Sequence, residues 1–224
     1  EDDLVENVPQ PANSGNVPEA LLSFPVPELN ELAAWMEAQS REPQRQITVQ
    51  GVLALASVLC GRIYATDTSN TSALYLMVLA GTGMGKNYTK LGIQQFLTDA
   101  NLTELLSGSG NTSAGAVFSA LHESPCHIQI TDEIGKHLQA ARRQQNGQMA
   151  EAFTTLTEAY SSTTGVLVPK NYSRMHLTPE QRKAQAKTLV QWPSITLLGL
   201  ATPGQVFENL SSREIEDGFL NRIV

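Results

Sequence analysis

The sequence predicts an α/β fold in which a mostly parallel central sheet is flanked by helices. Apolar runs at 74–79 and 194–200 have the length of buried strands, and residues 127–131 form a third candidate strand. Helical patterns separate these strands, an alternation typical of parallel sheets. The chain has 224 residues, of which 41% are hydrophobic, so it is long enough to bury a sizeable core.

The N-terminal part differs in composition from the rest. Residues 1–27 combine acidic residues and asparagines with five prolines, which predicts a disordered or extended lead-in. Residues 28–38 and 46–62 carry apolar positions at helical spacing, so we expect 28–65 to form a small helical segment beside the sheet. Residues 66–224 then form the core. The chain stops at Val224 inside an apolar run, so we expect the C-terminal part of this core to be missing.

The most informative motif joins the first strand to a helix predicted over 88–96. We call residues 81–86, Gly-Thr-Gly-Met-Gly-Lys, the glycine turn. Its glycines permit positive φ and close backbone approach, and a helix N-terminus favours an anion. Lys86 would reach the terminal phosphates of a nucleotide. The candidate nucleotide-binding residues are Gly81, Thr82, Gly83, Met84, Gly85, Lys86, Asn87 and Tyr88.

The glycine turn departs from the pattern G-x-x-x-x-G-K-[ST] at two positions, where the chain has Ala80 and Asn87. The hydroxyl expected at position 87 normally ligates Mg²⁺. An asparagine carbonyl can also ligate a hard cation, so Asn87 stays a candidate metal ligand. We expect ATP and Mg²⁺ as ligands. The alternative is a strand-to-helix turn with a purely structural role.

The elements after this helix are less regular. Residues 102–106 are a candidate short strand, and Asn111 or Thr112 is the expected N-cap of a helix that runs to about His122. Helices are expected at 134–143 and 149–160. Residues 165–168 are expected to pair with 171–175 as a hairpin. Thr178 precedes a helix start, 203–210 is a short helix, and 219–224 begins a last strand or helix.

A pair of acids, Asp132 and Glu133, follows the strand at 127–131. In a nucleotide hydrolase, an acid at this position holds Mg²⁺, and a neighbouring glutamate orients and deprotonates the attacking water. We therefore predict Asp132 as a metal ligand and Glu133 as a catalytic residue. The alternative is an ordinary polar strand end.

Two further residues are candidates for catalysis. Thr202 follows the strand at 194–200, where it would face the γ-phosphate or serve as an N-cap before Pro203. Arg222 lies in an apolar stretch, where a guanidinium needs a partner. It would pair with a carboxylate of its own fold, or reach the γ-phosphate on a neighbouring subunit as an arginine finger.

The net charge of −7 is unevenly distributed. Residues 136–191 hold eight Lys or Arg against three Glu, a balance of +5, so the remainder carries −12. A basic segment in an acidic body indicates a local contact with a polyanion. The longest apolar run, 52–60, is too short to span a bilayer. The two cysteines are flanked by hydrophobic residues, as expected of reduced thiols in a cytoplasmic protein.

The succession of motifs over residues 25–224 resembles a family of phage and prophage P-loop ATPases. It comprises Gly81-Thr-Gly-Met-Gly-Lys86, Asn111-Thr-Ser-Ala-Gly-Ala-Val-Phe-Ser-Ala-Leu121, Ile130-Thr-Asp-Glu-Ile-Gly135, Leu156-Thr-Glu-Ala-Tyr160, Pro193-Ser-Ile-Thr-Leu-Leu-Gly199 and Asp217-Gly-Phe-Leu-Asn-Arg222. Members are described as helicase-like or primase-helicase-like and accompany phage replication. The resemblance implies a P-loop NTPase fold with a RecA-like or AAA+ core. The C-terminal helical lid of the AAA+ branch is not in this chain, which leaves the branch open.

The resemblance also implies roles for particular residues. Lys86 matches the phosphate lysine, Asp132 the metal acid and Glu133 the water-activating glutamate, while Thr202 and Arg222 match a polar sensor and an arginine finger. Related ring helicases insert channel-facing hairpins where this chain has its basic segment. The residues implied to contact single-stranded DNA are Lys170, Tyr172, Arg174, Arg182, Lys183 and Lys187. A solvated basic face is the alternative.

Three functions are compatible with these patterns. We favour an oligomeric ATPase, a ring such as a hexamer, which couples hydrolysis to movement on DNA in a bacterial host cytoplasm. A nucleotide-binding scaffold or helicase loader with little turnover is the second, because Asn87 replaces the usual hydroxyl. A DNA-packaging-type motor with the same core is the third.

Overall fold

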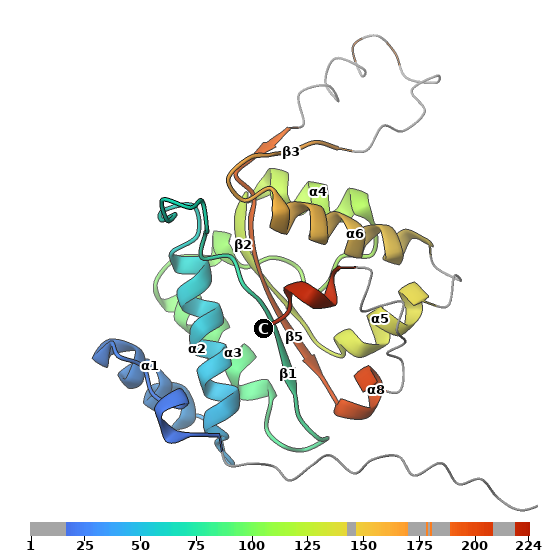
Figure 1. The fold of residues 1–224 in the computed structure, drawn as a ribbon. Helices are drawn as coiled ribbons and strands as arrows, with labels where there is room; N and C mark the ends of the chain where they lie inside the picture. The colour runs from blue at the N-terminus through green and yellow to red at the C-terminus, as the bar shows by residue number, and fades with distance from the viewer. Residues whose placement is uncertain (1–16, 143–146, 170–177, 179, 181–188, 208–217) are drawn as a thin grey trace, which may run out of the picture.

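The computed structural model describes residues 17–142, 147–169, 178, 180, 189–207 and 218–224 (Figure 1). Three parallel strands form the main sheet, in the order β1 (Tyr75–Leu79), β5 (Ser194–Ala201), β2 (Cys126–Thr131). All eight residues of β5 are buried, as expected of a central strand covered on both faces. The predicted α/β class and parallel sheet are confirmed.

Two isolated β-bridges extend the main sheet, one beyond β2 and one beyond β1. Leu106 pairs in parallel with Ile128 of β2, and Ile223 pairs in parallel with Tyr75 of β1. The predicted strand at 102–106 is therefore wrong except for its last residue. Residues Thr103–Leu105 form the 3-10 helix η2, because the Leu105 and Leu106 N–H groups donate back to carbonyls three residues earlier. The last segment forms η3 (Leu220–Arg222) before its bridge.

The connections reverse direction at two neighbouring strands, β1 and β5. From β1 the chain passes through α3 (Asn87–Asp99) to Leu106, beyond β2. From β5 it passes through α8 (Pro203–Phe207) to Ile223, on the other side of β1. Ligands of open α/β sheets bind at the carboxyl ends of the strands where the connections reverse in this way. The topology therefore predicts a ligand between the ends of β1 and β5.

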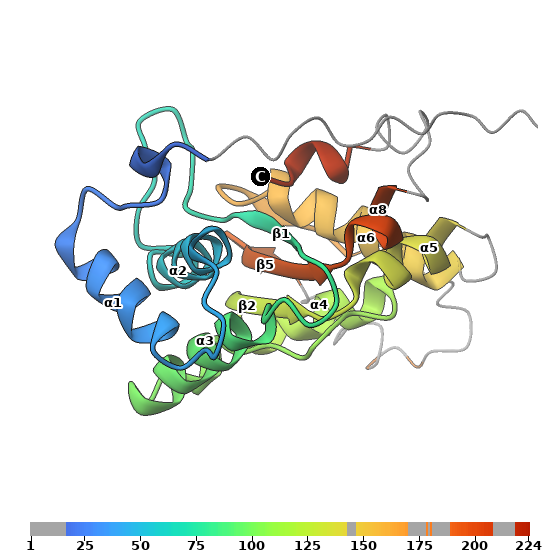
Figure 2. The ribbon, with the colours of Figure 1, turned by 90° about the horizontal axis from the view of Figure 1, so that it is seen from below.

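One face of the sheet is covered by α1 (Pro27–Glu37), α2 (Arg45–Leu59) and α3, as Figure 2 shows. Leu76, Val78, Leu198 and Leu200 point into this layer and are buried with the apolar side chains of α2 and α3. A hydrogen bond of 2.6 Å between the hydroxyls of Ser57 and Thr196 ties α2 to the central strand. The two N-terminal helices therefore share one apolar core with the sheet.

The other face is covered by α4 (Ala114–Glu123), α5 (Ile134–Arg142), α6 (Gly147–Ser161) and α8 (Figure 2). Its core includes Tyr75, Leu197 and Ile134. The N-cap of α4 is Ser113, whose Oγ accepts from the Ala116 N–H at 3.2 Å. The expected caps Asn111 and Thr112 are wrong, because the helix begins later than the sequence pattern indicates.

Within the described residues, the first strand of the predicted hairpin pairs with a strand later in the chain. β3 (Val166–Leu167) pairs antiparallel with β4 (Val190–Gln191), and this ribbon projects from the body in Figure 1. Residues 171–175, the expected partner, lie outside the described residues. So do all six candidate DNA-contacting residues, which are Lys170, Tyr172, Arg174, Arg182, Lys183 and Lys187. Within the described ranges, no helix has both the length and the apolar character needed to cross a bilayer.

Candidate nucleotide-binding site

The glycine turn leaves β1 at the edge of the sheet where the strands end, which we call the carboxyl-end edge. Gly83 and Gly85 have φ of +81° and +72°, in the left-handed region that glycine adopts without strain. The helix α3 begins at Asn87, and no side chain caps its first turn. The Tyr88 N–H of that turn donates to the Gly85 carbonyl at 3.2 Å, and the positive end of the helix dipole favours an anion at this position.

Residues 40–44, between α1 and α2, lie directly against the glycine turn. A Cβ added to Gly85 would stand 3.2 Å from the Glu42 carbonyl oxygen. The Tyr88 hydroxyl donates to the Gln44 carbonyl at 2.8 Å, accepts from the Gln44 N–H at 3.1 Å and lies 2.7 Å from the Thr48 hydroxyl. The Tyr88 side chain, predicted to bind nucleotide, is therefore buried and holds residue 44 in place.

Gly83 and Gly85, the two glycines of the glycine turn with positive φ, provide a matched test of the contact between this turn and residues 40–44. Gly83→Ala is expected to lower the free energy of unfolding by about 1–2 kcal/mol, the cost of a left-handed L-residue. A Cβ at Gly83 meets nothing within 4 Å, whereas one at Gly85 meets the Glu42 carbonyl. Gly85→Ala should therefore cost more than Gly83→Ala in urea unfolding. Equal losses would mean that residues 40–44 do not rest on the turn.

Lys86 is half-buried at the carboxyl-end edge, and its Nζ donates to the Ala80 carbonyl at 3.5 Å, a long and weak hydrogen bond. The ammonium group is thus folded back over the glycine turn. Its positive charge also contributes to lowering the pKa of Glu133. Lys86 and Glu133 lie at the same carboxyl-end edge, with the end of β5 between the strands that they follow.

Asp132 and Glu133 form a tight turn directly after β2. Glu133 has φ +52°, an uncommon conformation for a residue with a side chain, and its N–H donates to Asp132 Oδ1 at 2.9 Å. The Glu133 carboxylate accepts from Lys136 Nζ at 2.6 Å in an exposed ion pair. This hydrogen bond is the main cause that lowers the pKa of Glu133 below 4.5, so the carboxylate is ionised at neutral pH.

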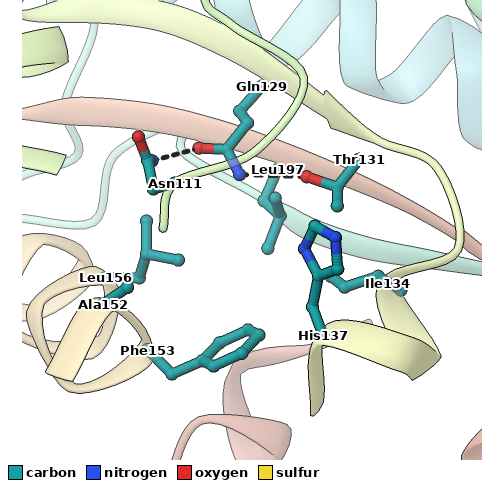
Figure 3. Close-up of a pocket in the computed structure, with 9 residues that line it drawn as sticks. All are labelled: Asn111, Gln129, Thr131, Ile134, His137, Ala152, Phe153, Leu156 and Leu197. Atoms are coloured by element: carbon teal, nitrogen blue, oxygen red, sulfur yellow. Dashed lines mark hydrogen bonds between the residues drawn. The ribbon is translucent and has the colours of Figure 1, made fainter. Parts of the chain in front are cut away.

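Hydrogen bonds join the side chains of Asn111, Gln129 and Thr131, the last two in β2 directly before this turn (Figure 3). Gln129 Nε2 donates to the Thr131 hydroxyl at 2.9 Å, and Asn111 Nδ2 donates to Gln129 Oε1. Gln129 and Thr131 are almost fully buried. Together with Asn111 and His137 they border a small cavity whose other walls are apolar. These hydrogen bonds fix Asn111 to the last residues of β2, directly before Asp132.

Sequence reasoning assigned no role to Gln129, although a signal was present. Residues 127–131 alternate polar and apolar side chains in a strand that the fold buries on both faces. A polar side chain at such a position must find a hydrogen-bond partner. The partner here, Asn111, comes from a loop whose position only the folded chain reveals.

Thr202 lies at the carboxyl-end edge beside the glycine turn. The Ala80 N–H donates to the Ala201 carbonyl at 3.1 Å, which places the ends of β1 and β5 next to each other. The Thr202 N–H donates to Gln205 Oε1 at 3.5 Å, at the start of α8. Lys86, Glu133 and Thr202 therefore come from three strands to one edge, and Asp132 adjoins Glu133.

Arg222 lies at the opposite, amino-end edge of the sheet, beside the first residue of β1. Its Nη1 donates to the Gly218 carbonyl at 2.5 Å and its Nη2 to the Ser161 hydroxyl at 2.9 Å. The guanidinium carbon is 5.9 Å from the centre of the Tyr160 ring. These partners are a carbonyl, a hydroxyl and a ring, and not the carboxylate that was one of the two expectations for Arg222.

No family model, curated protein or solved structure matches this chain. Among the residues that the structure describes, no three His, Cys, Asp or Glu side chains gather as a metal-ion cluster.

Proposed function

We propose that the chain is a P-loop ATPase that binds ATP with Mg²⁺ at the glycine turn and hydrolyses it. The observation that carries this proposal is geometric: the glycine turn with Lys86, the Asp132–Glu133 pair and Thr202 follow three neighbouring parallel strands and so lie at one edge of the sheet. A phosphate-binding lysine and a water-activating carboxylate must lie on either side of one terminal phosphate. The topology puts that position where ligands of open α/β sheets bind.

Each residue at this edge has a role in the proposal. Lys86 and the N-terminal turn of α3 hold the phosphates, and Thr202 contacts the terminal phosphate from β5. Glu133 orients the attacking water and accepts its proton. Its ion pair with Lys136 is exposed on both sides, so separating the two charges to admit water costs little.

The side chains present fit a magnesium ion. Asp132 offers a partly exposed carboxylate, and Asn87 an exposed amide oxygen at the first residue of α3. Mg²⁺ takes one or two protein ligands and completes its shell with phosphates and water, so a cluster of three acids is not required. When bound, the ion would neutralise charge on the phosphates.

We further propose a helicase-like role on DNA in phage-type replication, supported by the resemblance of the whole motif succession to phage ATPases. The chain between β3 and β4 carries five Lys or Arg and one Glu, as a polyanion contact requires. Arg222 lies at the edge opposite Lys86, so it could reach a γ-phosphate only on another copy. The arginine-finger role thus requires a homo-oligomer, such as a ring.

A nucleotide-binding scaffold with little turnover is the second candidate. Asn87, where the pattern expects Ser or Thr, is the observation that favours it. Tight nucleotide binding that is independent of Mg²⁺, by a monomer without steady-state hydrolysis, would support the scaffold over the ATPase.

The test of the site itself is nucleotide binding by Lys86→Ala. Loss of a hydrogen bond to a charged group costs about 1.5–3 kcal/mol, so the affinity for a fluorescent ATP analogue should fall by about 10- to 150-fold. Lys90→Ala, on the next turn of α3, is the matched control and should bind normally. Equal affinities for the wild type and both variants would refute the proposed site.

A further inference from the structure

A polar cleft of about 470 Å³ lies at the amino-end edge of the sheet, away from the glycine turn. Three segments meet there: residues 69–73 before β1, residues 160–164 at the end of α6, and Asn221 with Arg222. The volume is within the range of small-molecule sites. Within one copy of the chain, these walls lie at the edge of the sheet opposite the nucleotide site.

Three contacts fix the orientation of the Arg222 guanidinium at this cleft. The Gly218 carbonyl and the Ser161 hydroxyl occupy two of the five N–H donors of its guanidinium. The Tyr160 ring beneath it is itself fixed by an edge contact with Tyr75, at 4.9 Å between ring centres. The orientation of the guanidinium is thus set before a ligand binds, which lowers the entropy lost on binding.

The other walls have the chemistry of an anion site. They present the hydroxyls of Ser69, Thr71, Ser161, Thr163 and Thr164, and the described lining residues include no Asp or Glu. A planar guanidinium among hydroxyl donors suits a ligand with several acceptor oxygens, above all a phosphate.

The cleft adjoins the β3–β4 ribbon. Thr164 in its wall immediately precedes Gly165, whose carbonyl accepts from the Trp192 N–H at 2.8 Å. Trp192 has φ +49°, and 55% of its surface is exposed at the base of the ribbon. An exposed indole is a surface on which a base can stack. A base stacked on Trp192 would therefore bring the phosphates of its strand near the Thr164 wall of the cleft.

We propose that this cleft binds a phosphate group through Arg222, and that the backbone of a single nucleic-acid strand supplies it. The inference rests on the proposed contact with nucleic acid, not on ATP hydrolysis. A free phosphate or nucleotide has the same chemistry and is the other source of the ligand.

The experiment measures binding of a fluorescein-labelled oligothymidylate by anisotropy, in a Lys86→Ala background that removes the nucleotide site. Arg222→Gln should weaken binding about tenfold and lower the slope of log affinity against log salt by about one. Ser161→Ala, which removes one anchor of the guanidinium, should weaken it by a smaller factor. Arg62→Gln is the matched control, because this exposed arginine follows α2 outside the cleft.

Competition at constant ionic strength separates the two sources. Displacement of the oligonucleotide by inorganic phosphate or AMP would assign the cleft to free phosphates. Displacement by an unlabelled strand, but not by phosphate or AMP, would assign the cleft to nucleic acid. Unchanged binding in both Arg222→Gln and Ser161→Ala, or an equal loss in Arg62→Gln, would overturn the proposal. If Arg222→Gln does not fold, Ser161→Ala and Thr164→Val decide by the same criteria. A wild type that binds the strand but does not hydrolyse ATP would refute the ATPase alone.

Discussion

Replacing Glu133 with Gln is expected to lower the rate of ATP hydrolysis by about 10²- to 10⁴-fold, the usual contribution of a positioned general base. The amide keeps the size of the side chain and the backbone turn, but it cannot accept the proton of the attacking water. Because Lys86 and α3 are unchanged, ATP should still bind. Steady-state hydrolysis and binding of a fluorescent ATP analogue, measured on one preparation, separate the two effects.

Glu123→Gln provides the control for this substitution. Glu123 is exposed at the end of α4, and the same change of charge there should leave the hydrolysis rate unaltered. Equal rates in Glu133→Gln, Glu123→Gln and an active wild type would remove Glu133 from the reaction. The lowered pKa of Glu133 adds a second expectation, namely that its carboxylate stays ionised and competent to a lower pH than that of an ordinary glutamate, because Lys136 stabilises the charged form.

Leu198→Ala is expected to lower the free energy of unfolding by about 2–5 kcal/mol, the range observed when a buried leucine is cut to alanine. Leu198 is fully buried in β5, where it faces the core shared with α2 and α3. The cost combines lost apolar burial with the cavity left behind. Urea unfolding monitored by circular dichroism measures it directly.

Leu91→Ala is the matched control, because 59% of the Leu91 side chain on α3 is exposed. A surface change of this kind usually alters stability by less than about 0.5 kcal/mol. A similar small loss in Leu198→Ala would mean that β5 is not the packed centre of the molecule.

Local patterns were sufficient to predict the three strands of the main sheet and the glycine turn. A short apolar run, a turn rich in glycine and a helical pattern are each encoded within a few residues, and β1, β5 and most helix bounds lie close to the expected positions. The meeting of Lys86, Asp132, Glu133 and Thr202 at one edge follows from parallel strands, whose carboxyl ends share an edge.

Contacts between distant segments could not be predicted in this way. The placement of β5 between β1 and β2 and the pairing of β3 with β4 depend on long-range packing that no local window contains. The bonds of Asn111 to Gln129 and of Tyr88 to Gln44 have the same origin. Arg222 illustrates the limit, since its sequence context indicated a need for a partner but not the ring and hydroxyl that it found.

The bonds of the Tyr88 hydroxyl to Gln44 and Thr48 have a consequence for truncation. A chain shortened to begin at residue 66 would lose both partners, because they belong to the two N-terminal helices and their connection. It would also expose Leu76, Val78 and Leu198 to water, since α2 covers them. The first helices therefore have to be retained in any minimal fragment intended to keep the glycine turn in shape.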